Sequence, residues 1–259
     1  MARTDEMWAQ LIKEKVSNIQ SAFDPTLSKS TFTSAELAQT IDHTLLKPDA
    51  TTAQIDELCD QAIQYNFKSC CVNGVNIPQV AKRLEGTSTI PCSVIGFPLG
   101  AGTTKCKAFE AQQAVLDGAK EIDMVINIGA LKSGQYVKVY DDIRSVVDAS
   151  SGNPVKVILE TVFLSDEEKV AASFISAEAG AAFVKTCTGF SGGGASVADV
   201  ALMKRAVGYK GGIVKVKASA GIRSHEKCLE MLRAGADRIG TSSGVAIMQK
   251  AETDNTDTY

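Results

Sequence analysis

Histidine, tryptophan and long apolar runs are scarce in this sequence of 259 residues. It has two histidines and one tryptophan, and its seven cysteines lack the paired spacing of a zinc site. No apolar run is long enough for a signal sequence or a membrane span. The net charge of −3 argues against a surface that binds nucleic acid or anionic lipid. We therefore expect a metal-free protein that has no nucleic-acid or membrane partner.

The content of cysteine and of apolar residues bears on location and architecture. Seven cysteines are an odd number, which favours reduced thiols over a disulfide framework and predicts a cytoplasmic location. With 44% apolar and 22% charged residues, the chain can bury one large core. Its length suits one barrel-sized domain. We predict a helical N-terminal extension over 1–34, a main domain over 35–250 and a flexible polar C-terminal tail over 251–259.

Apolar and β-branched runs alternate with helix-like segments from residue 41 onward. The runs typical of strands are 41–46, 67–72, 90–95, 122–128, 155–161, 182–186, 213–217 and 237–241. The main helix-like segments between them are 52–65, 104–117, 135–149, 166–179, 196–207 and 224–234. Eight such strands separated by helices predict an α/β protein with a TIM (β/α)8 barrel. A doubly wound open sheet is the alternative, but no glycine-rich phosphate turn follows the first strand.

Charged side chains occupy one side of several predicted strands, and apolar side chains occupy the other. In a barrel, alternate residues point toward the axis, and active sites lie at the carboxyl ends of the strands. By this alternation, the inward-facing set contains Asp123, Asn127, Lys156, Glu160, Lys185, Lys215 and Lys217. We expect Lys156 and Lys215 to be structural partners of Glu160 and Asp123. An ordinary apolar core does not have this composition, so the site is predicted at the barrel axis.

Two of these lysines lie near the ends of strand-like runs that stop at glycine-containing turns. A buried ammonium is costly there unless chemistry uses it. Burial and a second ammonium about 6 Å away together favour the neutral, nucleophilic form of a lysine. Lys185 and Lys217 are therefore predicted to serve Schiff-base chemistry as nucleophile and neighbouring cation, and the residues alone leave the reverse assignment open. Asp123, on a strand across the barrel, could move protons between the amine, a water molecule and the substrate carbon.

Small and hydroxyl-bearing residues follow the last two strand-like runs. Ser219 to Arg223 and Gly240 to Gly244 offer backbone N–H groups and hydroxyl groups to an anion. These loops are where barrels commonly bind a substrate phosphate. The pattern therefore predicts a phosphorylated small-molecule substrate.

Residues of the first two strand-like runs complete the predicted site. Asp42 and Thr44 share an inward face, where a supporting hydrogen bond and simple packing fit equally well. Cys71 could line the pocket, although a buried free thiol is the commoner case. His43 and His225 fall on outward or post-strand positions, so we expect no ligand or acid–base role for them.

Six stretches, in order, resemble the deoxyribose-phosphate aldolases, a metal-free class I aldolase family with the TIM-barrel fold. They are Ile41 to Leu46, Glu121 to Val125, Val157 to Thr161, Phe183 to Gly189, Val216 to Arg223 and Gly240 to Ser243. By this resemblance, Lys185 forms the Schiff base, Lys217 perturbs it and Asp123 relays protons. The implied reaction is reversible cleavage of 2-deoxy-D-ribose 5-phosphate to D-glyceraldehyde 3-phosphate and acetaldehyde. No cofactor is implied. The expected partners are small-molecule phosphosugar and aldehyde substrates, and the sequence is compatible with a homodimer without fixing the oligomeric state.

The resemblance also assigns phosphate contacts and shows two departures. The implied contacts are Gly189, Ala220, Gly221, Ser242 and Ser243. Relatives usually have a second glycine in place of Ala220, so a positive φ would strain the chain there. Some relatives carry a basic residue in place of Phe190. That part of the phosphate site is therefore expected to have less positive charge in this chain.

Tyr259, the last residue, matches family members in which a mobile tail ending in tyrosine assists proton exchange at the enamine carbon. An inert frayed end is the alternative for this tail. Two other functions compete with the aldolase. One is a sugar-phosphate isomerase or lyase that uses a carboxylate base, and the other is a catalytically silent phosphosugar-binding protein. The paired inward lysines argue against both.

Overall fold

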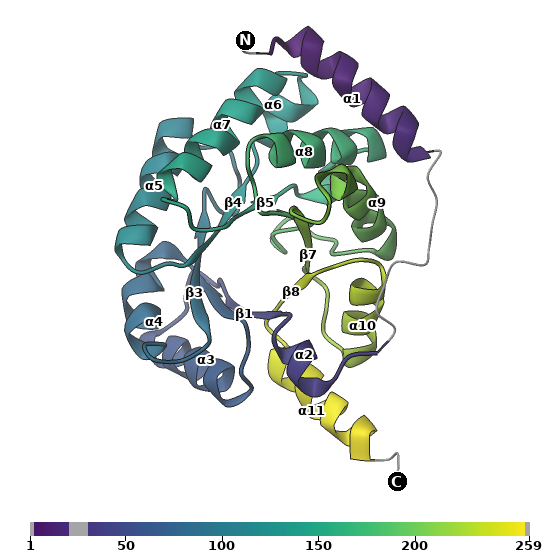
Figure 1. Cartoon of the computed structure of the whole chain (residues 1–259). Helices are drawn as coiled ribbons and strands as arrows, with labels where there is room; N and C mark the ends of the chain where they lie inside the picture. Colours follow the sequence, from purple (N-terminus) through teal and green to yellow (C-terminus); the bar gives the residue numbers. More distant parts are fainter. Residues whose placement is uncertain (1–2, 21–30, 257–259) are drawn as a thin grey trace.

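Eight parallel strands form a closed barrel in this computed structural model, which describes residues 3–20 and 31–256. The strands are β1 (Ile41–Leu45), β2 (Ser69–Val72), β3 (Ile90–Ile95), β4 (Glu121–Val125), β5 (Val155–Ile158), β6 (Phe183–Lys185), β7 (Lys215–Ser219) and β8 (Arg238–Thr241). Because β1 pairs with both β2 and β8, the sheet has no free edge (Figure 1). The predicted TIM (β/α)8 barrel is confirmed.

Helices surround the barrel and connect successive strands (Figure 1). They are α2 (Ser34–Ala38), α3 (Thr52–Gln64), α4 (Ile77–Arg83), α5 (Thr104–Leu116), α6 (Ile128–Lys132), α7 (Tyr136–Ala149), α8 (Asp166–Glu178), α9 (Val197–Val207), α10 (His225–Arg233) and α11 (Gly244–Thr256). Three short 3-10 turns are η1 (Gly74–Asn76), η2 (Thr161–Phe163) and η3 (Gly208–Lys210). Capping boxes start α2, α3 and α8: a threonine or serine side chain accepts from the third backbone N–H, and the glutamate or glutamine side chain at that third position accepts from the N–H of the cap. The six predicted helical segments agree with α3, α5, α7, α8, α9 and α10 to within a residue at each end.

Three of the strand boundaries that differ from the sequence expectation have a clear local cause. β4 stops at Val125 because the Asn127 side chain caps α6, accepting from the backbone N–H of Ala130 at 3.0 Å. β5 stops at Ile158 because Glu160 has a left-handed backbone with φ of 57°. β7 starts at Lys215, not at residue 213, because η3 and two positive-φ glycines prolong the preceding turn.

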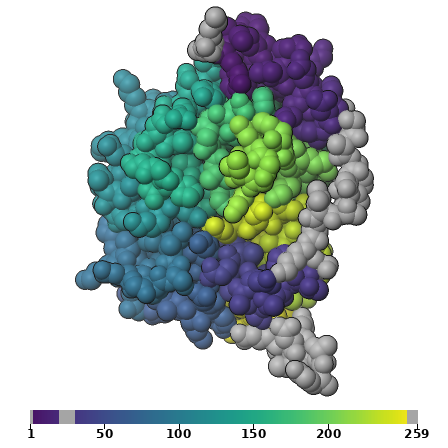
Figure 2. Space-filling view, viewed as in Figure 1, coloured from purple at the N-terminus to yellow at the C-terminus, as the bar shows by residue number. Residues whose placement is uncertain are grey.

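Helix α1 (Asp5–Gln20) packs against the outside of the barrel across α7, α8 and α9 (Figures 1 and 2). Trp8 is buried, with its ring 5.5 Å from Tyr140 and 5.8 Å from Phe174, centre to centre. The Asp5 carboxylate accepts a 2.7 Å hydrogen bond from the backbone N–H of Val137 in α7. The helix predicted near the N-terminus is therefore present and is an integral part of the packed domain. Among the described residues, no helix has the length and apolar content needed to cross a membrane.

Candidate active site

Seven ionisable side chains meet inside the barrel, and each is less than a tenth exposed. We call them the barrel network, and they are Asp42, Glu121, Asp123, Lys156, Lys185, Lys217 and Arg238. They come from six strands, β1 and β4 through β8. Their outward neighbours, such as Val184 and Val216, pack in the apolar core between barrel and helices. The predicted separation of ionisable and apolar faces is therefore present in the structure.

Asp123 lies at the centre of the barrel network. Its Oδ2 accepts hydrogen bonds from Lys185 Nζ at 2.7 Å and from Lys217 Nζ at 2.8 Å. Its Oδ1 accepts from Lys156 Nζ at 2.8 Å. Burial alone would raise the pKa of Asp123, but the three ammonium groups more than offset it and hold this pKa well below its usual range. Asp123 is therefore ionised at neutral pH and organises the lysines around one carboxylate.

Lys217 is a permanently charged neighbour of Lys185. Its Nζ contacts Asp42 Oδ2 at 2.6 Å as well as Asp123 Oδ2. Although burial lowers the pKa of Lys217, the carboxylates of Asp123 and Asp42 raise it above its ordinary value. Because Lys185 and Lys217 donate to the same oxygen, their nitrogens are no more than about 5.5 Å apart. This is the proximity of two cations that the sequence predicted.

A cavity of about 280 Å³ opens at the carboxyl ends of the strands and distinguishes the two lysines. Lys185 lines this cavity, whereas Lys217 is fully buried and does not line it. The two residues are paired in the β6–β7 register, so the difference comes from where their side chains end. The geometry therefore favours Lys185 as the amine that a ligand reaches.

The charges of the barrel network are unequal, because it has four cations and three carboxylates. Lys156, Lys217 and Arg238 each contact at least two carboxylates. Lys185 contacts one, Asp123. Lys185 is therefore the one cation of the barrel network that a single carboxylate contacts.

Two predicted inward ion pairs are wrong. Lys156 contacts Asp123 as expected, but its second close partner is Glu121 at 2.5 Å and not Glu160. Glu160 follows the end of β5, so the strand alternation that assigned it no longer applies. Lys215 is exposed at the start of β7, at the end of the barrel opposite the cavity. It therefore has no place in the barrel network.

Asp42 makes ion pairs within the barrel network. Its sequence position predicts only a supporting hydrogen bond or simple packing, so the structure gives this carboxylate a larger role. Its Oδ1 accepts hydrogen bonds from Arg238 Nη1 and Ser69 Oγ, each at 2.6 Å. Arg238 also contacts both Glu121 oxygens, at 3.0 and 3.1 Å. Sequence reasoning missed Glu121 and Arg238, although Glu121 shares the alternation of Asp123. Thr44 lines the cavity, and its hydroxyl donates to the backbone oxygen of Asp42 at 2.9 Å.

Cys71, Cys92 and Asp123 form the group of described side chains that lie close enough together to hold a metal ion. Three ammonium groups already donate to Asp123, and burial raises the pKa of Cys92 well above its ordinary value. Metal binding needs thiolates and an available carboxylate, so the group is poorly suited to a cation. Cys71 is fully buried and does not line the cavity. It corresponds to the buried thiol that the sequence also allowed.

The two histidines lie away from the barrel axis. His43 is on β1, facing outward against Phe67, and its Nε2 is 2.7 Å from Gln61 Oε1. Burial lowers its pKa, so it is neutral near pH 7. His225 begins α10. These placements agree with the outward and post-strand positions predicted for both residues.

The cavity rim contains most of the predicted phosphate contacts. Gly189, Ala220, Gly221 and Ser242 line it. Ser243 lies beside the rim and does not line the cavity; its backbone N–H donates to Thr241 Oγ1 at 2.9 Å. Tyr259, the predicted proton carrier, lies outside the described residues.

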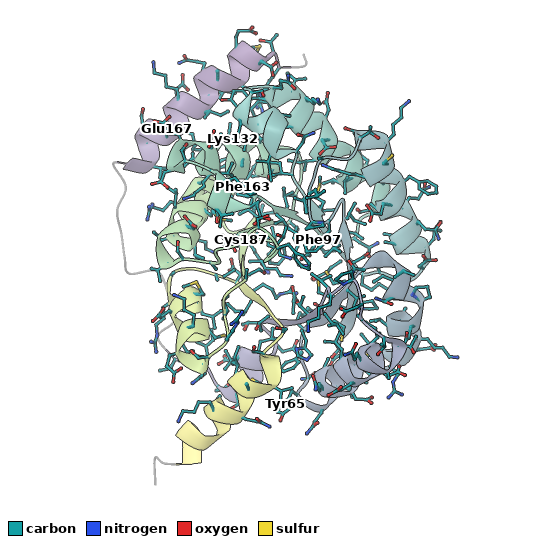
Figure 3. The ribbon with its side chains drawn as sticks, turned by 180° about the vertical axis from the view of Figure 1, so that it is seen from behind. Tyr65, Phe97, Lys132, Phe163, Glu167 and Cys187 are labelled. Carbon is teal, nitrogen blue, oxygen red and sulfur yellow. The ribbon has the colours of Figure 1, made fainter. Side chains whose placement is uncertain are left out.

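An aromatic pair and two cations complete the cavity wall. Phe190, half exposed, lines the cavity, and its ring lies edge-on to Phe97, 5.1 Å away. Phe97 lies toward the middle of the ring of strands (Figure 3). Lys47 and Arg223 also line the cavity, and neither has an ion-pair partner among the described residues. Sequence reasoning missed Lys47, which lies in a loop where no periodic pattern marks an inward position. It placed Arg223 in a predicted phosphate loop but gave its side chain no role.

Ala220 has a φ of 76°, so its backbone is in the left-handed region. The strain anticipated for an alanine at this position is therefore real. A side chain in this region costs roughly 1–2 kcal/mol relative to an unstrained conformation. Its neighbour Gly221, with φ of 74°, adopts a similar conformation without this cost.

Ala220→Gly is expected to raise the free energy of unfolding by about 0.5–1 kcal/mol. Glycine removes the steric strain but makes the unfolded chain more flexible, so part of the gain is lost. Urea denaturation of the two proteins measures the difference. Ala218→Gly, the same change two residues earlier in β7, is the matched control and should destabilise the protein. Equal or lower stability of Ala220→Gly would show that the strain is compensated elsewhere.

Sequence comparisons place the chain among aldolases. The DeoC/LacD family aldolase profile matches residues 36–250. The deoxyribose-phosphate aldolase of Staphylococcus haemolyticus is 56% identical over 218 residues, which cover 84% of this chain and 98% of that protein. That of Carboxydothermus hydrogenoformans is 56% identical over 220 residues, which cover 83% of this chain and 95% of that protein. The family match begins after α1.

Structural comparisons agree with the sequence matches. A protein of Coccidioides immitis assigned to the deoxyribose-phosphate aldolases superposes with a TM-score of 0.93 at 40% identity. The superposition covers 97% of this chain and 99% of that one. The tetrameric deoxyribose phosphate aldolase of Aeropyrum pernix gives a TM-score of 0.79 at 31% identity, with 94% of this chain and 97% of that one covered.

Proposed function

The chain belongs to the DeoC/LacD family of aldolases, and from this we propose that it reversibly cleaves 2-deoxy-D-ribose 5-phosphate through an imine on Lys185. The products are D-glyceraldehyde 3-phosphate and acetaldehyde. The observation that carries the proposal is that Lys185 lines the cavity while Lys217 stays buried and charged beside it. The names of relatives matched over nearly their whole length support the choice of substrate.

Each proposed step conserves atoms and electrons. The neutral Lys185 amine attacks C1 of the open-chain sugar, and the resulting carbinolamine takes up one proton and loses water to give a protonated imine, a proton that the final hydrolysis returns. A base removes the proton of the C3 hydroxyl, the C2–C3 bond breaks, and its electrons move to the imine nitrogen. Glyceraldehyde 3-phosphate leaves, and an enamine of two carbons remains. Protonation of the enamine carbon and hydrolysis of the imine release acetaldehyde and restore the amine.

Asp123 and Lys217 divide the proton-handling roles in this proposal. Asp123 Oδ2 accepts from the Lys185 ammonium in the free enzyme. When Lys185 becomes a protonated imine, its nitrogen keeps one N–H in place of three, so that oxygen can also hold a water molecule or accept a proton. Lys217 remains a cation because two carboxylates hold its proton. Tyr259 is proposed to carry the proton to the enamine carbon.

The direct test is turnover of the proposed substrate. Purified protein incubated with 2-deoxy-D-ribose 5-phosphate should release acetaldehyde and glyceraldehyde 3-phosphate in equal amounts, which two coupled NADH assays can follow separately. Activity should persist with EDTA, because the proposed mechanism uses no metal. Formation of an isomeric sugar phosphate without acetaldehyde would instead support the isomerase alternative.

The phosphate group is proposed to bind at the cavity rim. Backbone N–H groups of Gly189 and Gly221 and the Ser242 hydroxyl supply donors to its oxygens. Lys47 and Arg223 supply positive charge, which Phe190 does not. Lys47 comes from the loop after β1 and Arg223 from the loop after β7, so the two approach the phosphate from different strands.

Lys47→Met is expected to raise KM for 2-deoxy-D-ribose 5-phosphate about tenfold with little change in kcat. A charge-assisted hydrogen bond is worth roughly 1.5–3 kcal/mol, and exposure of Lys47 reduces this. Steady-state kinetics at low and high salt measure the effect, which should shrink at high salt. Lys120→Met, an exposed lysine before β4 at the other end of the barrel, is the control. An unchanged KM would remove Lys47 from the phosphate site.

A further inference from the structure

Ser219 has a hydroxyl group that the proposed mechanism does not use. Ser219 is one of the residues that line the cavity, but it is only 4% exposed, and its buried Oγ has no hydrogen-bond partner among the described residues. Its backbone is fixed, because the N–H donates to Thr186 Oγ1 and the carbonyl accepts from the same hydroxyl, both at 2.9 Å. A buried hydroxyl without a partner is costly, which points to a ligand that completes it.

Ser219 lies between the reactive amine and the phosphate rim. On β7 it shares the inward face with Lys217 but is two residues nearer to the carboxyl end. It is paired with Gly240 of β8, where an added Cβ would come within 2.2 Å of Ser219 Oγ. The absence of a side chain at Gly240 therefore makes room for this hydroxyl. Ala220 and Gly221 of the rim follow directly in the sequence.

We propose that Ser219 Oγ binds the hydroxyl on C4 of the sugar and thereby selects α-hydroxylated phosphorylated aldehydes as acceptors. This inference rests on the proposed function. A sugar joined to Lys185 through C1 and to the rim through its phosphate places C4 between the two ends, at the level of Ser219. The C3 hydroxyl loses its proton when the C2–C3 bond breaks, so its oxygen is expected to lie near Asp123. The C4 hydroxyl keeps its proton, and a serine hydroxyl, which donates and accepts, is its matching partner.

The test compares two acceptors in the addition direction with acetaldehyde as donor. One is D-glyceraldehyde 3-phosphate, and the other is 3-phosphooxypropanal, which lacks only the hydroxyl at issue. The wild-type protein should favour the hydroxylated acceptor about tenfold in kcat/KM, and Ser219→Ala should reduce this preference to near one. Each ratio is measured on one preparation, so a smaller active fraction of the variant does not affect it.

Two further variants and one trapping assay separate binding from structural effects. Ser219→Thr keeps a hydroxyl and should retain more of the preference than Ser219→Ala. Ser176→Ala removes a buried hydroxyl in α8 that bonds to Ala172 O, and it should keep the wild-type ratio. Borohydride trapping of acetaldehyde alone should be unchanged in Ser219→Ala, since acetaldehyde has no hydroxyl.

The outcomes that overturn the inference are distinct from failure of the proposed function. A wild-type ratio near one, or an undiminished ratio in Ser219→Ala, excludes the contact while leaving the aldolase assignment intact. A wild-type protein that adds acetaldehyde to neither acceptor overturns the proposed function and this inference together.

Discussion

Lys185→Met is expected to abolish aldol cleavage, lowering kcat by at least about 10⁴-fold. The variant keeps the cavity but lacks the amine at the end of β6 that forms the proposed imine, and the Lys47 amine, in the loop after β1, does not replace it. In the wild-type protein, borohydride reduction in the presence of acetaldehyde should add one ethyl group to the peptide that contains Lys185. Peptide mass mapping identifies the modified lysine. The expectation follows from Lys185 lining the cavity while Lys217 does not.

Lys215→Met is the matched control for this experiment. Lys215 lies on an adjacent strand but is exposed at the opposite end of the barrel, so its loss should leave turnover and trapping unchanged. An ethyl group found on Lys217 instead of Lys185 would reverse the assignment of nucleophile and neighbour. Turnover that survives in Lys185→Met would exclude the imine on this residue altogether.

Lys217→Met is expected to lower kcat/KM by about 10²–10³-fold at pH 7 and by less at pH 9. The wild-type Lys217 stays charged over this range, because Asp123 and Asp42 outweigh burial and raise its pKa. Removing that charge takes away the nearby cation that favours the neutral form of an amine, and a higher pH offsets part of that loss. A pH–rate profile of both proteins measures the effect. Identical losses at the two pH values would contradict charge perturbation as the role of Lys217.

Stability must be followed in the same variants, because Lys217→Met also removes a cation from two buried carboxylates. Breaking a buried pair in this way typically costs about 3–5 kcal/mol. Lys107→Met is a suitable control, since Lys107 forms a buried 2.6 Å pair with Asp142 between α5 and α7, outside the barrel. It should lose comparable stability without changing the shape of the pH–rate profile.

The sequence allowed the barrel and its inward lysines to be predicted because both depend on alternation along single strands. β7 begins two residues later than expected, yet Lys217 still faces inward, since a shift of two preserves the face of every residue. Alternation failed at Glu160, where the left-handed backbone ends the regular pattern. It also assigned Lys215 to the interior, although alternation fixes a face and not a depth along the barrel axis.

Other features of the site could not be read from the sequence. Arg238 and Glu121 are 117 positions apart, and nothing local in either segment indicates the other. Lys47 and Arg223 project from loops that have no periodicity. Ser219 was recognised only as part of a phosphate loop, because a hydroxyl without a partner is a property of three-dimensional surroundings.

Closure of the barrel joins β1 to β8, and it has a consequence for how the protein is made. Asp42 contacts Arg238 across 196 positions, and Asp123 contacts Lys217 across 94. Until the last two strands dock, Asp42 lacks its close partners Lys217 and Arg238, and Asp123 lacks one of its three ammonium partners, so the closed ring is disfavoured before synthesis is complete. The reactive amine is therefore assembled only with the finished fold.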